Sequence, residues 1–161
     1  MRGVSLTPAG PGYAAVISTL HGICFGKAVQ TPWDEAAVAG LLAMPGAFAF
    51  VAHRHKSPMG FVLARRAADE AEIITIGTYP AARRQGVAAA LLEQTIETAI
   101  KEGARRIFLE VAADNTAALA FYGGHKFTVC GHRKGYYQRP EGPVDAQVLV
   151  LEPAVGPNPG T

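Results

Sequence analysis

The sequence has little cysteine and no residue spacing that would organise a metal site. Its 161 residues include two cysteines, Cys24 and Cys130, without a Cys-x-x-Cys pair or a Cys/His ligand pattern. A disulfide framework and a structural zinc site are therefore not expected, and both thiols should be reduced. The five histidines show no metal-ligand spacing either, so we expect no bound metal.

Long apolar runs and a concentrated charge of one sign are also lacking. No run approaches the roughly 18 apolar residues of a membrane span, and the N-terminus lacks the basic and apolar regions of a signal peptide. The formal net charge is only +2 and the arginine pairs are scattered, whereas nucleic-acid-binding domains usually carry a clustered basic patch. We expect a cytoplasmic protein that binds neither membranes nor nucleic acid.

The sequence does have the composition of a folded domain. Hydrophobic residues make up 49% of the chain and charged residues 17%, which is enough apolar material for a core. The length fits one domain. We expect a single domain over residues 1–153 and a frayed tail, rich in Pro and Gly, over residues 154–161.

Apolar periodicity and turn residues divide the first half of the chain into helices and strands. Residues 7–12 are broken by Pro and Gly, and Pro45-Gly46 ends a helix because neither residue continues one easily. The polar residues 53–58 should form a hairpin loop of several residues between two strands. The elements expected here are helices 13–24 and 31–43 and strands 47–52 and 59–65.

The central segment indicates a strand, a helix and a second strand in succession. Residues 72–78 are rich in β-branched side chains, which favour a strand. The helix that starts at Val87 carries its apolar residues on one side, and Gly103 should end it. A second strand follows over residues 106–111. Such a βαβ unit predicts that the two strands are parallel.

The last third of the chain predicts one short helix and two strands. The helix should cover residues 116–122, with Asp114 or Asn115 as its N-cap. The strands should lie near residues 127–132 and 146–152. Together with the preceding elements they would complete a mixed sheet.

The turn between strand 72–78 and the following helix has the features of an anion site. A helix N-terminus carries free N–H groups and the positive end of the helix dipole, so a diphosphate is a natural ligand there. Gly86 lets the backbone approach an anion closely, Ala88 is nearly as small, and Arg83 and Arg84 add positive charge. The alternative is an ordinary strand-to-helix turn that uses glycine for its geometry.

The pattern Arg83-x-x-Gly86-x-Ala88 resembles the pyrophosphate signature of the GNAT superfamily of N-acetyltransferases. The resemblance implies an α/β GNAT fold: a mixed, mostly antiparallel sheet with a central splayed parallel strand pair and flanking helices. It also implies acetyl-CoA as co-substrate, held in the gap between the splayed strands. The cofactor-binding residues that it implies are Ile76, Gly77, Thr78, Arg84, Gln85, Gly86, Val87, Ala88, Ala89 and Asn115.

A longer stretch, most of residues 20–152, resembles the RimI group of N-terminal protein acetyltransferases. The similarity is strongest from residue 72 to residue 146, and it includes the runs 107–122, 133–137 and 141–146. It implies that the acceptor is the N-terminal α-amine of a protein or peptide, such as a ribosomal protein. One departure is Lys126, which stands where the group has Gly, and we expect Gly123 or Gly124 to end the preceding helix early instead.

Two residues are candidates for the proton transfers that acetylation of an amine requires. The amine must lose a proton before it attacks, and the leaving thiolate is stabilised by a nearby hydroxyl donor. Glu110 is a carboxylate in an otherwise apolar strand and suits the base, although it could instead pair with an arginine such as Arg105. Tyr122 suits the acid, although it could be a core aromatic. The resemblance favours the catalytic role for both.

The remaining candidates concern the acceptor side and the acetyl group. Trp33, Tyr136 and Tyr137 could line the acceptor site, while Trp33 could equally pack in the core at a helix start. Asn115 could hydrogen-bond the pantetheine arm or cap the short helix, or do both. The N–H of Thr78 could hold the oxyanion.

Transfer of acetyl to a protein α-amine is the favoured function, and two alternatives stay open. One is a GNAT enzyme for a small-molecule amine. A polyamine enzyme should show an acidic channel, whereas the 13 Asp and Glu residues do not cluster. The other is a module that binds acyl-CoA without turnover, which the presence of both Glu110 and Tyr122 argues against.

Overall fold

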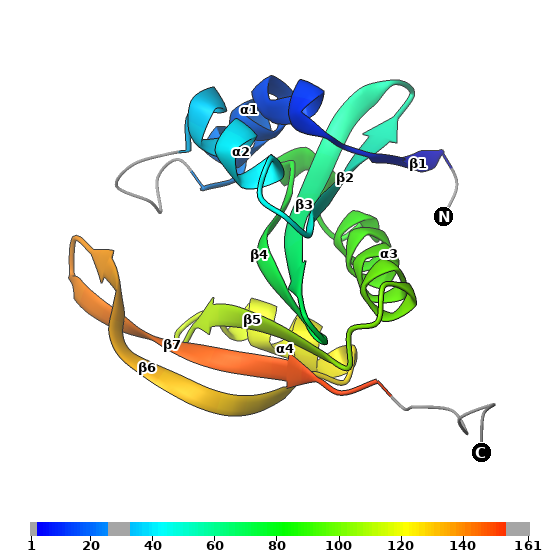
Figure 1. The fold of residues 1–161 in the computed structure, drawn as a ribbon. Helices are drawn as coiled ribbons and strands as arrows, with labels where there is room; N and C mark the ends of the chain where they lie inside the picture. The colour runs from blue at the N-terminus through cyan, green and yellow to red at the C-terminus, as the bar shows by residue number, and fades with distance from the viewer. Residues whose placement is uncertain (1–2, 26–32, 154–161) are drawn as a thin grey trace, which may run out of the picture.

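The seven strands in the described part of the chain join one mixed sheet. The computed structural model describes residues 3–25 and 33–153, so the predicted tail and the start of the second predicted helix, at Thr31-Pro32, lie outside the described residues. The strand order is β1-β2-β3-β4-β5-β7-β6. Neighbouring strands are antiparallel except for the central pair β4 and β5, which is parallel. The predicted α/β fold class is confirmed (Figure 1).

The elements alternate along the chain much as the sequence predicts, with two short 3₁₀ turns at Pro11–Tyr13 and Pro80–Ala82. The strands and helices are β1 (Val4–Pro8), α1 (Ala14–Phe25), α2 (Glu35–Leu42), β2 (Ala47–Arg54), β3 (Ser57–Ala67), β4 (Glu70–Thr78), α3 (Val87–Lys101), β5 (Arg106–Ala112), α4 (Thr116–Gly124), β6 (Thr128–Arg139) and β7 (Gly142–Leu151).

Helices cover the two faces of the sheet unequally. On one face α1 packs on β3 and β4 and α2 packs on β2, around a buried cluster that includes Ile17, Phe61 and Leu63. On the other face α3 and α4 pack against a second cluster, with Leu91 and Leu109 at its centre. In Figure 1, β5, β7 and β6 lie below α1 and α2 and diverge from the strands that these two helices cover.

The parallel pair β4 and β5 splays apart, as the resemblance implies. The two strands pair only from Glu70 with Arg106 to Glu72 with Phe108. In the pairing of β3 with β4, Ile74 is left without an opposite residue, and such a bulge increases local twist. From there β5 pairs with β7 alone, and Figure 1 shows the strands diverging. Backbone polar groups along the second half of β4 are thus left for another partner.

In the N-terminal half one prediction was wrong and one strand was not predicted. The loop between β2 and β3 is a two-residue turn: His55 and Lys56 both have positive φ, +51° and +68°, which matches the twist of a tight hairpin. The chain start also forms a strand, because Val4–Pro8 pairs with β2. Pro8 is tolerated there since β1 is an edge strand.

The α4 helix ends at Gly124, one of the two predicted positions. The left-handed residue that follows is Lys126 itself, with φ +72°, and not a glycine. The N–H groups of Lys126 and Phe127 donate to the carbonyls of Gly123 and Tyr122, at 3.0 and 3.1 Å. Lys126 therefore closes the helix as a glycine would, and Tyr122 stays in a regular turn.

Candidate active site

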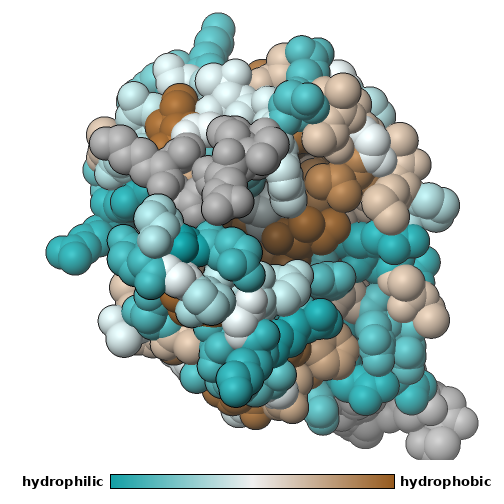
Figure 2. All heavy atoms as spheres, turned by 90° about the vertical axis from the view of Figure 1, so that its left-hand side faces the viewer, coloured by the Kyte–Doolittle hydropathy of each residue, from teal (hydrophilic) through white to brown (hydrophobic). Residues whose placement is uncertain are grey.

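A cavity of about 570 Å³ occupies the gap between the splayed strands. Its walls come from α1, β4, β5, α4 and β6. Figure 2 looks at the side toward which α2 and the β6–β7 hairpin project, and it shows apolar side chains gathered in a recess among hydrophilic ones. The cavity brings together seven of the predicted site residues: Trp33, Ile76, Glu110, Asn115, Tyr122, Tyr136 and Tyr137.

Glu110 and Tyr122 reach this cavity from opposite faces of the sheet. Side chains alternate along β5, and Leu109 and Val111 belong to the cluster beneath α3 and α4, which also includes Tyr122. Glu110 therefore points to the face that α1 and α2 partly cover. Only the gap between β4 and β5 allows a carboxylate on one face and a phenol on the other to line the same cavity.

The Glu110 carboxylate is held by an arginine of β6. Its Oε1 lies 2.8 Å from Nε of Arg133, and the Glu110 side chain is 17% exposed. The predicted alternative of an ion pair is thus present, but its partner is not Arg105, whose N–H donates to the carbonyl of Asp69. The Glu110 carboxylate is therefore ion-paired and also lines the cavity.

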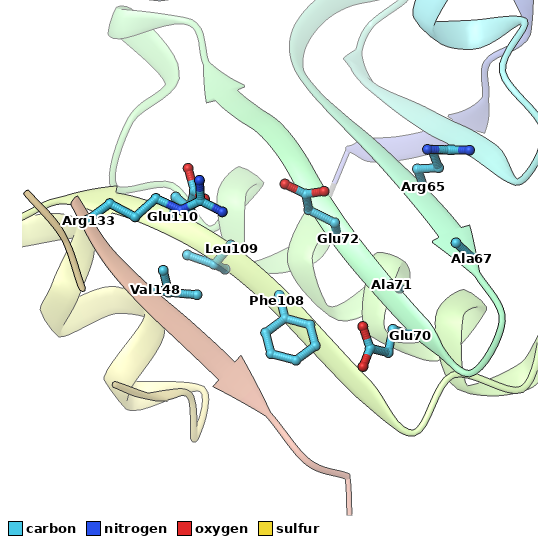
Figure 3. A pocket seen from close by; sticks show the side chains of 10 residues that line it. All are labelled: Arg65, Ala67, Glu70, Ala71, Glu72, Phe108, Leu109, Glu110, Arg133 and Val148. Atoms are coloured by element: carbon cyan, nitrogen blue, oxygen red, sulfur yellow. The ribbon is translucent and has the colours of Figure 1, made fainter. Parts of the chain in front are cut away.

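A smaller hollow of about 310 Å³ adjoins the cavity on the Glu110 face (Figure 3). It shares Leu109 and Glu110 with the larger cavity. Glu72 of β4 points across the hollow toward Glu110 and Arg133, while Phe108 forms part of its floor. An extended chain whose end lies at Glu110 would therefore find further space on this face.

Tyr122 is a buried phenol with its ring packed among aromatics. It is 7% exposed, and its ring centroid lies 5.1 Å from that of Phe121 and 5.7 Å from that of Phe127. Burial, with a smaller contribution from Tyr137, raises the pKa of Tyr122 far above its ordinary value. The hydroxyl keeps its proton at neutral pH and remains a donor toward the cavity.

Tyr136 and Tyr137 form an edge-to-face pair beside Glu110. Their ring centroids are 5.1 Å apart, and the guanidinium of Arg133 lies 5.3 Å from the centre of the Tyr136 ring, in reach of a cation–π contact. A hydrogen bond to the Glu110 carboxylate raises the pKa of Tyr136, and burial raises that of Tyr137. Both phenols are therefore neutral donors next to the carboxylate.

Trp33 packs on α1 and lines the cavity, so both of its predicted roles are compatible with its position. Its ring stacks on His21 at 4.6 Å between centroids and 9° between planes. His21 is 4% exposed, and among the described residues its Nδ1 has no hydrogen-bond partner. Burial lowers the pKa of His21, so this wall of the cavity is aromatic and uncharged.

The predicted anion-binding turn lies at the N-terminus of α3, outside the lining of the cavity. Gly86 is the N-cap, with φ +82°, and Arg84 is also left-handed, with φ +64°. Within the described chain, no hydrogen bond has its donor at a backbone N–H of residues 84–89, and Ala90 is the first to donate, to the carbonyl of Gly86. A curved row of free N–H groups at a helix N-terminus is suited to a phosphate.

Some of the residues predicted to bind the cofactor also have local structural roles. The Gln85 side chain is turned away toward Arg54 and the carbonyl of Ala81. Gly77 makes room for α1, because a Cβ there would lie 2.8 Å from the Phe61 ring and 3.1 Å from Sγ of Cys24. Thr78 ends β4 opposite Gly60.

Asn115 is the N-cap of α4, as one of the two predicted options had it. Its Oδ1 accepts the N–H of Ala118 at 3.1 Å, and its side chain also lines the cavity.

Over the part of the chain that the structure describes, no group of three or more His, Cys, Asp or Glu side chains could hold a metal ion. None of the described helices is long and apolar enough to cross a membrane.

The sequence profile of the acetyltransferase (GNAT) family matches residues 15–127. This match covers most of the chain, including α1, the splayed pair, the turn before α3 and Tyr122. The chain belongs to the GNAT family.

Two curated GNAT relatives are similar in sequence. The [ribosomal protein bS18]-alanine N-acetyltransferase of Escherichia coli K12 is 36% identical over 91 residues, which are 56% of this chain and 62% of that protein. This chain therefore spans about three fifths of the length of that relative. The N-alpha-acetyltransferase RimI of Mycobacterium tuberculosis is 34% identical over 111 residues, or 66% of this chain and 68% of that protein.

A solved structure agrees with the fold over almost the whole chain. The crystal structure of the ribosomal-protein-S18-alanine N-acetyltransferase from Escherichia coli superposes with a TM-score of 0.87, 24% sequence identity and 97% coverage of both chains. The GNAT fold thus extends beyond the matched profile to β6 and β7, which carry Arg133, Tyr136 and Tyr137.

Sequence reasoning missed one part of this GNAT cavity. Arg139 lines it and forms an ion pair with Asp114. The predicted strand near residues 127–132 ends seven residues before Arg139, whereas β6 continues to Arg139. The alternation of Tyr137 and Arg139 along a longer strand could have indicated it.

Proposed function

We propose that this chain transfers the acetyl group of acetyl-CoA to the N-terminal α-amine of a protein or peptide, with residues 1–153 acting as one acetyltransferase domain. The observation that carries the proposal is the cavity at the splayed strands, where Glu110 and Tyr122 meet from opposite faces of the sheet. The GNAT family membership and the similarity to the two N-terminal acetyltransferases support it.

The residues around the turn fit acetyl-CoA. The free N–H groups of residues 84–89 would hold the pyrophosphate, and the dipole of α3 adds to their attraction for an anion. The unpaired edge of β4 from Ile76 to Thr78 would hold the pantetheine arm, with Asn115 across the gap. Acetyl-CoA supplies the acetyl group as a reactive thioester.

The cavity residues supply the proton transfers. Glu110 takes a proton from the ammonium of the acceptor, directly or through a water, so that the nitrogen lone pair is free. The amine nitrogen then bonds to the acetyl carbon as the bond from that carbon to sulfur breaks, and the nitrogen loses its second proton to solvent as the amide forms. The Tyr122 hydroxyl gives its proton to the departing sulfur, so that CoA leaves as a thiol, and Tyr122 takes a proton back from solvent.

A protein α-amine suits this site better than a lysine side chain. The reference pKa of an α-amine is about 7.7–8.0, against about 10.4 for lysine, so a single carboxylate is an adequate base. Trp33, Tyr136 and Tyr137 would line the acceptor path on the Glu110 face, and the smaller hollow would take the residues that follow. By analogy with the relative named for bS18, the acceptor we favour is a ribosomal protein, which would place the enzyme in the cytoplasm.

Release of CoA with a panel of acceptors tests the proposed function. The panel contains peptides with a free N-terminus, the same peptides with a blocked α-amine and an internal lysine, and small amines such as spermidine. Binding of acetyl-CoA alone is measured beside it. We expect the fastest release with free N-termini. Faster release with a small amine would favour the small-molecule alternative, and binding without release would favour a non-catalytic module.

Replacing Gly86 should abolish the thermal protection that acetyl-CoA gives. A ligand at 100 times its Kd stabilises a protein by about 2.7 kcal/mol, a Tm rise of about 5–10 °C at this length. In Gly86→Val the β-branched residue cannot easily adopt φ +82°, so the turn should rearrange and the rise should fall to near zero. Differential scanning fluorimetry with and without acetyl-CoA measures it.

Gly103→Val is the matched control for this prediction. Gly103 follows the other end of α3 with φ +99°, so its replacement imposes similar backbone strain far from the turn. It should lower Tm and keep the full rise with acetyl-CoA. Equal protection of Gly86→Val and the wild type would remove the turn from the cofactor site.

A further inference from the structure

Strand β6 departs from regular pairing next to the cavity. Arg133 pairs with Ala146 and Tyr137 pairs with Val144, so residues 134–136 stand opposite Asp145 alone. Bulges of this kind bend a strand and redirect its side chains. Asp145 is the residue of β7 that faces the bulge.

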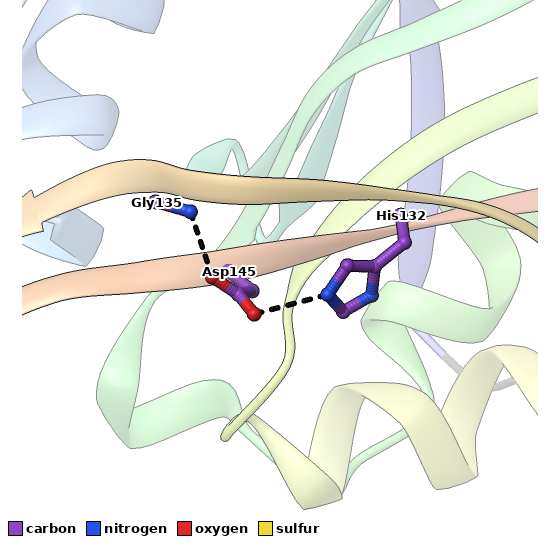
Figure 4. A network of polar contacts seen from close by, with 3 residues as sticks. All are labelled: His132, Gly135 and Asp145. Carbon is purple, nitrogen blue, oxygen red and sulfur yellow. Dashed lines mark hydrogen bonds and ion pairs between the residues drawn. The ribbon is translucent and has the colours of Figure 1, made fainter.

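The side chain of Asp145 holds the bulge from below (Figure 4). Its Oδ1 accepts the N–H of Gly135 at 2.7 Å, and its Oδ2 lies 3.0 Å from Nε2 of His132. Gly135 is left-handed, with φ +61°, as a turn inside a strand requires. The Gly135 N–H first, and His132 second, lower the pKa of Asp145, so the carboxylate is an acceptor at neutral pH.

The main chain of Asp145 is also engaged. Its carbonyl accepts the N–H of Ala113 at 2.8 Å, just beyond the end of β5. Asp145 therefore connects the bulge of β6 to the segment that leads from Glu110 toward Asn115. The side chain is 38% exposed, so it lies at the rim of the site and is not part of the lining of the cavity.

The bulge sets how far along β7 the two tyrosines lie. Counted on from Arg133 opposite Ala146 in a regular ladder, Tyr137 would stand opposite Gly142, whereas the extra residues of the bulge bring it opposite Val144. Tyr136 and Tyr137 therefore lie closer to Val148, the partner of Glu110 in β7, and both line the cavity that spans the two faces of the sheet. The Tyr136 ring also lies against Arg133, which holds the Glu110 carboxylate.

We propose that Asp145 is a positioning residue of the acetyl-transfer site: by accepting the Gly135 N–H it fixes the bulge that places Tyr136 and Tyr137 at the level of the cavity. Its effect on acetyl transfer rests on the proposed function. Asp145 does not touch the acceptor and acts through the two tyrosines. Its loss should therefore weaken use of the acceptor and leave binding of acetyl-CoA at the turn before α3 unchanged.

Three variants of the full chain separate positioning from mere stability. Asp145→Ala removes the acceptor for Gly135, Asp145→Asn keeps an oxygen there, and His132→Ala removes only the imidazole contact with Oδ2. Because a displacement of about 1 Å at a site can cost about 100-fold, we expect Asp145→Ala to lower kcat/KM for a free-amine peptide about 10- to 100-fold, with a raised peptide KM. The KM for acetyl-CoA should stay within about twofold, and Asp145→Asn and His132→Ala should remain within about threefold of the wild type.

Steady-state kinetics and crystal structures of the wild type and Asp145→Ala distinguish a positioning role of Asp145 from a purely structural one. Loss of folded enzyme alone would lower the apparent kcat and change neither KM, and that result would overturn the proposal. So would an Asp145→Asn variant as impaired as Asp145→Ala. If the wild type released no CoA, the proposed function would fail by itself. The positions of Tyr136 and Tyr137 in the two crystal structures would then test whether Asp145 positions the two rings, and rings that do not move in Asp145→Ala would refute it.

Discussion

Glu110→Gln is expected to lower kcat by about 10²- to 10⁴-fold, the usual contribution of a general base. Glutamine keeps the size of the side chain and a hydrogen-bonding oxygen for Arg133, but it cannot take the ammonium proton. The affinity for acetyl-CoA should change little, because Glu110 and the turn at residues 84–89 are separate. Since a larger fraction of the amine is neutral at higher pH, the loss should shrink as pH rises. Single-turnover rates from pH 6.5 to 9.5 measure it.

Glu72→Gln is the matched control. Glu72 faces the same hollow from β4 (Figure 3) and is given no role in proton transfer, so its rate should stay within a few-fold of the wild type. If Glu110 is only the ion-pair partner of Arg133, Glu110→Gln should lose thermal stability and keep the wild-type rate per folded molecule. That outcome would move the base to a water molecule.

Tyr122→Phe is expected to lower kcat by a similar factor, about 10²- to 10⁴-fold, with little change in stability. The ring is buried among Phe121 and Phe127, and phenylalanine preserves that packing. Only the hydroxyl is lost, and with it the donor to the departing sulfur. Unlike Glu110→Gln, this variant should not recover at high pH, because a neutral amine does nothing for the leaving group. The same single-turnover rates across pH distinguish the two.

Tyr137→Phe is the control for Tyr122→Phe. It removes a neighbouring phenol that lines the same cavity and should affect the peptide KM more than the rate of the chemical step. A fully active Tyr122→Phe would assign the acid role to another donor and leave Tyr122 as a core aromatic.

The sequence was most informative where function depends on local structure. The βαβ unit follows from β-branched residues before Gly86 and an apolar stripe after it, and both are local patterns. The alternation that any strand imposes is enough to put Glu110 on the face opposite the buried Leu109 and Val111. The N-cap at Asn115 also follows from residue type and spacing.

Features set by long-range pairing could not be read from the sequence. The partner of Glu110 is Arg133, although Arg105 is much nearer in the sequence, because β7 and β6 follow β5 in the sheet. The bulge opposite Asp145 depends on the register between β6 and β7, and exposed edge strands have a weak apolar pattern to specify one. The left-handed Lys126 likewise breaks a local preference that the rest of the turn overrides.

Mass spectrometry of an acetylated peptide decides whether the acceptor is an α-amine. A peptide with a free N-terminus and one internal lysine is incubated with acetyl-CoA and the full chain, and fragment-ion mass spectrometry locates the modification. We expect a single acetyl group on the α-nitrogen, absent with Glu110→Gln at neutral pH over the same time. An acetyl group on the lysine nitrogen, or an unmodified peptide while a small amine in the same mixture is acetylated, would show that the acceptor is not a protein α-amine.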